Sequence, residues 1–296
     1  MRGLGRASAA ISIVNALPTG FGAAAALRLG LHATVELRRA GPGEVPEYRV
    51  RPEDTPLLRA TVGAALRAYA PLESHHVLLD VESSIPPGRG LKSSSAVTVA
   101  VFEAIAIARG HAPPPEEVAR RSADLAQQSG QSATGAFDDA VASAAGGVVM
   151  TDNRRREVLA RAEMPPELLC AILIPPAEHA PSPQLVDRFA GLEEGSTRAF
   201  EAARDGRLLE AMARNSELVE RAMGYRVAAT RDRLVSAGAE LVTVTGMGPA
   251  LAVLVRRPGL PAVLDELGKQ EGRVLVSGFR RAGETVGGSP EVRSVP

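Results

Sequence analysis

The residues best suited to chemistry lie in one stretch, residues 86–96, which reads Pro-Pro-Gly-Arg-Gly-Leu-Lys-Ser-Ser-Ser-Ala. Gly88 and Gly90 let the backbone approach a ligand closely, and a helix that begins after them presents unpaired N–H groups and the positive end of its dipole. Arg89 and Lys92 add positive charge, while the serines add hydroxyl groups that can bind phosphate or ligate Mg²⁺. The stretch therefore predicts a phosphate-binding site.

Three other interpretations of this stretch have to be weighed. A Walker A loop is excluded, because Leu91 precedes Lys92 and no glycine stands at the required spacing. A dinucleotide fingerprint is a weak match, because its third glycine is replaced by Ser93. The third interpretation is a glycine–proline turn capped by serine into an ordinary helix. The concentration of glycines, cations and hydroxyl groups favours an anion site over that turn.

A second candidate stretch, residues 134–140, reads Thr-Gly-Ala-Phe-Asp-Asp-Ala. A carboxylate beside a phosphate site could accept a proton from a hydroxyl group. Adjacent residues point in different directions on a helix, so we expect only one of the pair, Asp138, to face the site. The alternative is that Asp138 and Asp139 are carboxylates at a helix start, where the helix dipole stabilises negative charge.

Residues 243–249, Thr-Val-Thr-Gly-Met-Gly-Pro, form a third glycine-containing motif. Such a motif shapes a ligand site or makes a strand–strand turn, and both interpretations favour glycine. His75 and His76 lack the spacing of metal ligands, so we expect ordinary surface or core positions for them. Cys170 lies in an apolar run and is expected to be inert packing.

The composition is that of a globular protein. The chain has 296 residues, with 34 Lys plus Arg against 34 Asp plus Glu, and 45% of its residues are hydrophobic. These values argue against disorder. The absence of a basic excess and the aromatic content of 3% argue against a nucleic-acid partner. The single cysteine excludes an internal disulfide and a multi-cysteine metal site.

No stretch of the sequence predicts a targeting or membrane segment. Residues 2–31 have a basic start and apolar character, but Ser12, Asn15 and Pro18 interrupt the apolar run that a signal peptide requires. The longest other apolar stretch, residues 96–108, is shorter than a membrane span and contains a glutamate. We therefore expect a cytoplasmic protein without a membrane partner.

The pattern of apolar residues predicts the elements that must position these motifs. We expect a first unit, residues 1–163, with strands over 33–37, 76–82 and near 148–150, and helices over 56–69, 96–109, 115–128 and from about 137. A second unit, residues 164–296, is expected to have a strand over 168–174, helices over 183–191, 196–222 and 226–237, strands over 240–245 and 250–255, a helix over 260–269 and a strand over 273–279. Residues after 281 lack periodicity and are expected to be loose. The fold class is α+β in two domains.

The motifs together resemble those of the GHMP kinases, the superfamily of galactokinase, homoserine kinase and mevalonate kinase. The pattern Pro-x-x-x-Gly-Leu-x-Ser-Ser from residue 86 fits that family's signature, and residues 89–96 look most like the archaeal-type shikimate kinases. Residues 134–140 and 243–249 are similar to the family's second acidic motif and its C-terminal glycine motif. Residues 5–20 are similar to its opening segment. Four motifs in the family's order make a specific resemblance over residues 5 to about 255.

The resemblance implies a fold with an N-terminal mixed α/β domain and a C-terminal ferredoxin-like α+β domain, with the site between them. It implies that ATP, with Mg²⁺, binds along Pro86, Pro87, Gly88, Arg89, Gly90, Leu91, Lys92, Ser93, Ser94, Ser95 and Ala96, and near Gly246 and Gly248. It assigns the catalytic base to Asp138, places Asn15 and Asp139 near the substrate, and makes Ser94 a metal ligand.

A second metal ligand is less well defined by the resemblance. Several superfamily members carry a glutamate eleven residues before the base, but this chain has Gln127 there. Asp124 is the nearest acid and stands where the archaeal-type enzymes carry glutamate, so we expect it to be the metal ligand.

The activity implied by the resemblance is phosphorylation of the 3-hydroxyl group of shikimate by ATP. The sequence leaves two alternatives open: a GHMP kinase for another hydroxyl substrate, such as homoserine or a cyclitol, and a non-catalytic homologue that senses a ligand. Ser94 and Asp138 are both retained, which favours catalysis. The sequence does not determine the oligomeric state.

Overall fold

The computed structural model describes residues 1–71, 74–176 and 186–287. Its N-terminal unit is a six-stranded sheet in the order β3-β4-β2-β5-β6, with β1 paired to β2. The strands are β1 (Arg2–Val14), β2 (Phe21–Arg39), β3 (Tyr48–Arg51), β4 (His75–Ser83), β5 (Val148–Asp152) and β6 (Glu157–Ala162). Neighbours are antiparallel except β3 and β4.

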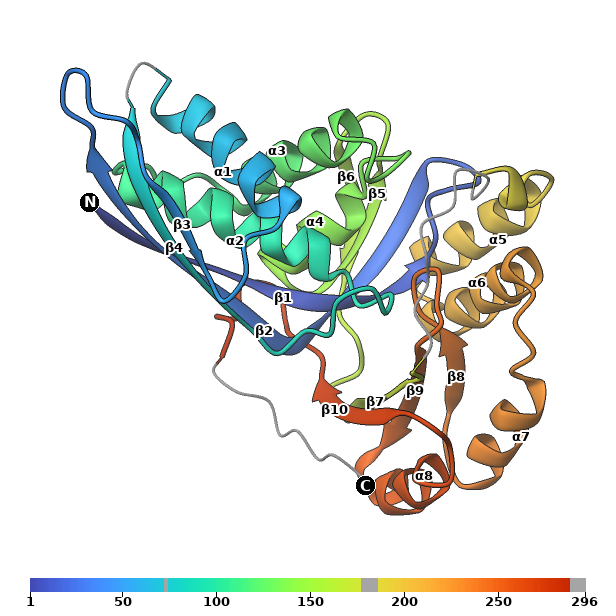
Figure 1. Cartoon of the computed structure of the whole chain (residues 1–296). Coiled ribbons are helices and arrows are strands. Elements are labelled where there is room, and N and C mark those ends of the chain that lie inside the picture. The colour runs from blue at the N-terminus through green and yellow to red at the C-terminus, as the bar shows by residue number, and fades with distance from the viewer. Residues whose placement is uncertain (72–73, 177–185, 288–296) are drawn as a thin grey trace.

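Four helices pack on one face of this sheet (Figure 1). They are α1 (Pro56–Tyr69), α2 (Ser93–Ala108), α3 (Pro115–Gln128) and α4 (Phe137–Ala145). Helix α2 is buried on almost every side, as its largely apolar sequence predicts, and it packs directly on β1 and β2. This central position fixes the start of α2, where the candidate phosphate motif lies.

The second unit is a four-stranded antiparallel sheet in the order β10-β7-β9-β8. Its strands are β7 (Leu168–Ile174), β8 (Leu241–Val244), β9 (Leu251–Arg256) and β10 (Arg273–Gly278), and its helices are α5 (Glu193–Arg204), α6 (Leu208–Met223), α7 (Ala228–Ser236) and α8 (Leu260–Leu267). Helices separate β7 from β8 and β9 from β10, which gives the ferredoxin-like order of elements. The α+β fold class and the ferredoxin-like second domain are therefore confirmed, and the expected boundary between residues 163 and 164 falls in the link between β6 and β7.

Several expected elements differ from those observed. The single helix expected over 196–222 is wrong, because the chain breaks into α5 and α6 at Gly206, whose φ is 82°. The helix expected over 183–191 lies partly outside the described residues, and its described part contains only a short 3-10 turn, Asp187–Phe189. Strand β1 and the first part of β2 were not expected from the sequence. No helix in the described part of the chain is long and apolar enough to cross a membrane.

The segment after β10 returns to the N-terminal unit. Phe279 pairs with Leu27 of β2, and the buried Arg280 donates hydrogen bonds to the carbonyl oxygens of Ser143 (2.8 Å) and Ala144 (2.7 Å), near the end of α4. Val286 is also buried. Beyond Arg281, the N–H of Gly283 donates to the carbonyl oxygen of Ala145 (2.9 Å). The expectation that residues after 281 are loose is therefore wrong as far as residue 287, because this hydrogen bond and the burial of Val286 give the segment packing that its sequence pattern does not reveal.

Candidate active site

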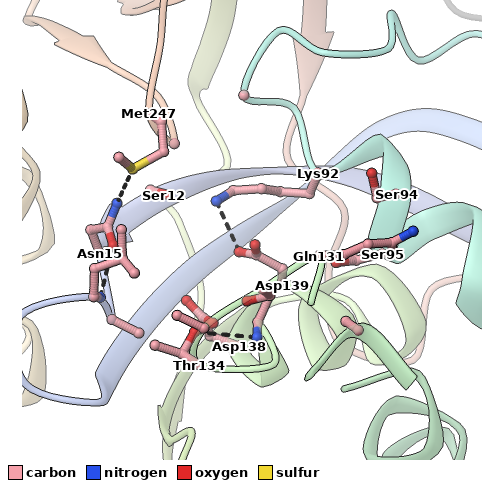
Figure 2. A pocket seen from close by; sticks show the side chains of 18 of the residues that line it. Ser12, Asn15, Lys92, Ser94, Ser95, Gln131, Thr134, Asp138, Asp139 and Met247 are labelled. Carbon is pink, nitrogen blue, oxygen red and sulfur yellow. Dashed lines mark hydrogen bonds and ion pairs between the residues drawn. The ribbon is translucent and has the colours of Figure 1, made fainter. Parts of the chain in front are cut away.

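A pocket of about 970 Å³ lies where the two units meet (Figure 2). Five parts of the chain line it: the end of β1 with the residues after it, the glycine loop with the start of α2, the segment from α3 to the start of α4, the loop after β8, and Val186. Residues far apart in sequence therefore converge on one cavity, and the three motifs identified in the sequence all reach it.

Helix α2 opens toward the pocket without a capping side chain. Its N-cap residue, Lys92, is left-handed (φ 62°), and no side chain in the described part of the chain caps the helix. The alternative interpretation of this stretch, a turn capped by serine into an ordinary helix, is therefore wrong about the cap. Ser93, Ser94 and Ser95 instead form the first turn and line the pocket. The free backbone N–H groups and the dipole of this first turn favour a bound anion such as phosphate.

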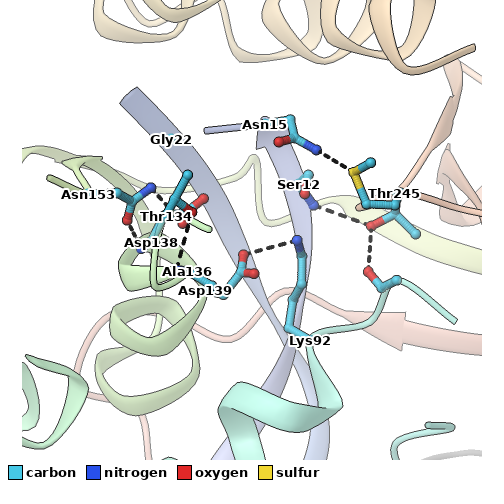
Figure 3. A network of polar contacts seen from close by, with 12 residues as sticks. Ser12, Asn15, Gly22, Lys92, Thr134, Ala136, Asp138, Asp139, Asn153 and Thr245 are labelled. Carbon is cyan, nitrogen blue, oxygen red and sulfur yellow. Dashed lines mark hydrogen bonds and ion pairs between the residues drawn. The ribbon is translucent and has the colours of Figure 1, made fainter. Parts of the chain in front are cut away.

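Lys92 also joins the two helix starts by an ion pair. Its Nζ lies 3.0 Å from Oδ1 of Asp139 on α4, and both side chains are only 12–13% exposed (Figure 3). The contact is a charge pair, since it lacks the alignment of a hydrogen bond. A positive and a negative group are thus held side by side at the pocket wall.

Asp138 is the more deeply buried carboxylate, with 4% of its surface exposed. Its Oδ1 accepts a hydrogen bond from Nδ2 of Asn153 (3.0 Å). Burial, followed by repulsion from Asp139, raises the pKa of Asp138 to about 7, against the lowering effects of Lys92 and Asn153. A carboxyl group tuned in this way can exchange a proton near neutral pH.

The two glycine motifs touch each other across the units. Thr245 Oγ1 donates to the carbonyl oxygen of Gly90 (3.2 Å) and accepts from the N–H of Ser12 on β1 (3.3 Å). A Cβ atom at Gly90 would overlap the Thr245 carbonyl oxygen, and the φ of Gly90 is 78°. Only glycine fits this close approach. The loop of the second unit therefore fixes the shape of the glycine loop before α2.

Comparison with known proteins gives a consistent result. The family model described as "GHMP kinases N terminal domain" matches residues 57–147. A shikimate kinase of Pyrococcus abyssi is 34% identical over 271 residues, which cover 87% of this chain and 93% of that protein. A shikimate kinase of Halobacterium salinarum is 34% identical over 290 residues, covering 96% and 99%. This chain belongs to the GHMP kinases, in the family of the archaeal shikimate kinases.

Solved structures of GHMP kinases share the fold at low sequence identity. The homoserine kinase of Cytophaga hutchinsonii aligns with a TM-score of 0.73 at 16% identity, covering 95% of this chain and 96% of that one. A mevalonate kinase aligns with a TM-score of 0.72 at 15% identity, covering 94% and 99%. At these identities the likeness concerns the fold alone, and it confirms the two-domain GHMP kinase architecture predicted from the motifs.

Most of the residues predicted for the GHMP kinase site meet in the pocket. Those that line it are Asn15, Gly88, Gly90, Lys92, Ser93, Ser94, Ser95, Asp138, Asp139, Gly246 and Gly248. Pro86, Pro87, Arg89, Leu91 and Ala96 are not among its lining residues. Leu91 and Ala96 are core residues, exposed by 1% and 0%, so they support the glycine loop from below.

The predicted metal ligand Asp124 does not line the pocket. Its carboxylate pairs with Nε of Arg156 at 3.3 Å, whereas Gln127, one turn further along α3, does reach the pocket. Within the described residues, no three His, Cys, Asp or Glu side chains gather into a metal-binding group. A metal ion at this site would therefore take its oxygen ligands from hydroxyl groups, from at most the Asp138 and Asp139 carboxylates, and from phosphate oxygens and water.

Sequence reasoning missed part of the pocket wall. Residues 129–134 (Ser-Gly-Gln-Ser-Ala-Thr), together with Ser12, Thr98, Ser122 and Met247, line it. The run of small polar residues directly before the acidic motif was a usable signal for the first group. Met247 lies inside the motif at residues 243–249, but only its two glycines were predicted to line the site; the Met247 Sδ lies 3.0 Å from Nδ2 of the predicted residue Asn15.

Proposed function

We propose that this protein transfers the γ-phosphoryl group of ATP to the 3-hydroxyl group of shikimate. The relatives that match nearly the whole chain are named shikimate kinases. The observation that carries the proposal is that an uncapped helix start bearing Lys92 faces a helix start bearing Asp138 and Asp139 across one pocket. Such a site can hold a phosphate group and a proton acceptor within reach of one hydroxyl group.

The nucleotide phosphates would bind at the start of α2. The backbone N–H groups of Ser93, Ser94 and Ser95 supply donors, and the open backbone at Gly88 leaves room for phosphate oxygens. Lys92 supplies the positive charge that balances charge developing on the transferred group. Because its Nζ is held by Asp139, this charge is positioned before the ligand arrives.

Asp138 would act as the base. Its carboxylate takes the proton of the acceptor hydroxyl as the oxygen forms its bond to the γ-phosphorus, and the bond from that phosphorus to the bridging oxygen of ADP breaks. A carboxyl group with a pKa of about 7 is near the optimum for proton transfer at neutral pH. Asp139 would keep Lys92 aligned and face the acceptor.

A magnesium ion would be held by the Ser94 hydroxyl group, which lines the pocket at the start of α2. The donor set fits, because Mg²⁺ prefers oxygen ligands and keeps several waters, so one protein hydroxyl beside phosphate oxygens is sufficient. When bound, the ion supplies charge neutralisation on the phosphate oxygens. The expectation that Asp124 ligates it stays a prediction, as does the cytoplasmic location.

The test is an ADP-release assay with shikimate, homoserine and a cyclitol as acceptors. We expect shikimate alone to stimulate ADP release, with stoichiometric formation of the 3-phosphate. Asp138→Asn should lower kcat at least about 10²-fold, as expected for the loss of a general base, while thermal unfolding shows that the variant is folded. Ser94→Ala should raise the magnesium concentration required for activity. Stimulation by another acceptor, or wild-type turnover in Asp138→Asn, would contradict the proposal.

A further inference from the structure

Asn153, directly after β5, holds both ends of the proposed base. It has no exposed surface. Its Oδ1 accepts the backbone N–H of Asp138 (2.9 Å), and its Nδ2 donates to Oδ1 of the Asp138 carboxylate (3.0 Å) (Figure 3). A single amide group thus fixes the main chain and the side chain of the same residue, which leaves the carboxylate little rotational freedom.

Asn153 is itself anchored on both sides of its backbone. Its N–H donates to the carbonyl oxygen of Gly20 (2.8 Å), and its carbonyl oxygen accepts a hydrogen bond from the Arg156 guanidinium. The same guanidinium donates to the carbonyl oxygen of Thr134 (2.8 Å) and to Oε1 of Gln127 (2.7 Å), which belong to the pocket wall. The position of Asn153 is therefore fixed relative to the pocket as well as to Asp138.

Strand β2 is shaped to accommodate this pair. A Cβ atom at Gly22 would lie 2.5 Å from Oδ2 of Asp138 and 2.8 Å from Nδ2 of Asn153. Any other residue at position 22 would push the carboxylate and the amide apart. Asn153 is not a lining residue of the pocket, so it does not reach a ligand there.

We propose that Asn153 is a positioning residue that orients the Asp138 carboxylate toward the acceptor hydroxyl group and stabilises its ionised form. The inference rests on the proposed function, because it assumes that Asp138 accepts a proton. An amide N–H donor favours the charged carboxylate, as does Lys92, whereas Asp139 opposes it. Arg156 reaches this cluster through the Asn153 carbonyl group.

The experiment is a pH–rate profile for Asn153→Ala and Asn153→Asp. Both variants lose the Nδ2 donor, but Asn153→Asp keeps the shape of the side chain and an acceptor for the Asp138 N–H, and it adds a carboxyl group beside Asp138. Since a hydrogen bond to a charged group stabilises it by roughly one to two pKa units, we expect the acid limb of kcat to move upward by about that amount in Asn153→Ala. In Asn153→Asp the limb should move further upward, because repulsion between the two carboxyl groups adds to the loss of the donor. At pH 7 kcat should fall about fivefold or more and recover toward wild type at pH 9, with an unchanged KM for ATP.

Thr151→Val is the matched control. Thr151 is a buried neighbour whose Oγ1 makes only long contacts, 3.4 Å to the Gly22 carbonyl oxygen and 3.5 Å to Asn153 Oδ1. We expect its pH profile to match that of the wild type. Thermal unfolding of all three variants reports whether each one folds.

Two results would overturn the inference. One is an acid limb at the wild-type pH in both Asn153 variants; the other is a fall in kcat that is equal at every pH, which a purely structural role produces. The activity of Asp138→Asn shows whether a negative result contradicts the role of Asn153 or the proposed function itself. If that variant is inactive while the Asn153 variants keep the wild-type profile, only the role of Asn153 is wrong; if it is active, the base assignment itself is wrong.

Discussion

Helices α2 and α4 begin in the same unusual way but carry opposite charges. The N-cap of α2 is Lys92 (φ 62°) and that of α4 is Ala136 (φ 51°); both are left-handed, and in the described chain neither helix start has a side-chain cap. A left-handed conformation costs a residue with a side chain about 1–2 kcal/mol. The start of α2 is followed by serines, whereas the start of α4 is followed by Asp138 and Asp139.

The difference in charge between the two helix starts indicates that the same left-handed, uncapped start can either be balanced by the protein's own carboxylates or be left to bind an anion. At α4 the helix dipole is balanced by carboxylates that belong to the protein. At α2 there is no such acid in the first turn, so the favourable position for an anion is left to a ligand. In the described chain only Lys92, Ala136 and Arg156 are non-glycine residues with positive φ, and Arg156 donates a hydrogen bond to the carbonyl oxygen of Thr134 at the pocket wall. Backbone strain in this protein is concentrated at the site.

Of the changes at the two helix starts, removing the positive charge at the start of α2 should have the largest effect on activity. Lys92→Met takes away the cation next to the proposed phosphate site and leaves Asp139 without its partner. We expect kcat/KM for ATP to fall about 10²–10³-fold, as for loss of one preorganised charge at a reacting group. Steady-state ADP release measures it.

The chain offers a matched control for this prediction, because Lys269 is its other lysine. Lys269 is a surface residue paired with Glu266, and its side chain is 68% exposed. Lys269→Met should leave kcat/KM for ATP unchanged. A similar loss in both variants, or a loss of less than about tenfold in Lys92→Met, would mean that the charge of Lys92 is not used.

Neutralising the two carboxylates at the start of α4, one at a time, should change the free energy of unfolding in opposite directions. The pKa of Asp138 is raised from 3.8 to about 7 by burial, so the folded state holds its proton longer than the unfolded state. The stability contributed by this group is therefore lost as pH rises from about 4 to about 7. Asp138→Asn should raise the free energy of unfolding by on the order of 1–3 kcal/mol at pH 8, and by less at pH 5.

Asp139→Asn should instead lower stability, since it leaves Lys92 partly buried and unpaired. Urea unfolding of both variants at pH 5 and pH 8 makes the comparison. Equal destabilisation by the two substitutions would show that burial does not oppose the charge on Asp138.

The local motifs could be predicted from sequence, whereas the contacts between them could not. Helices α1 and α3 begin and end where their prolines and apolar spacing predict. Strand β1 and the first part of β2 were missed because residues 3–10 and 22–26 are mostly glycine, alanine and serine, which have low strand propensity. The two segments form strands here because β1 pairs with β2, β5 pairs with the first part of β2, and helices pack on them.

The same distinction, between local motifs and contacts made by the fold, separates the site residues that could be predicted from those that could not. Lys92 and Asp138 lie in compact motifs, so their chemistry was readable in order along the chain. Asn153 reaches Asp138 only through the fold, and nothing in its neighbourhood distinguishes it from an ordinary turn residue. Asp124 and Gln127 share a face of α3, three residues apart, so spacing could not decide which one reaches the pocket. Arg156 contacts both, but only Gln127 lies at the pocket wall.

The smallest expected effect tests the strain shared by the two helix starts. Ala136→Gly removes the Cβ that makes the left-handed conformation costly, and unlike a change at Lys92 it removes no charge. We expect the free energy of unfolding to rise by up to about 1 kcal/mol, because relief of strain exceeds the entropy that glycine adds to the unfolded chain. Ala144→Gly, the same change within α4, should lower it by about 1 kcal/mol, since there glycine adds entropy to the unfolded state and removes a Cβ that packs against the core. If both substitutions destabilise the protein equally, the left-handed start of α4 stores no strain. The starts of α2 and α4 would then share a backbone conformation but not an energetic cost.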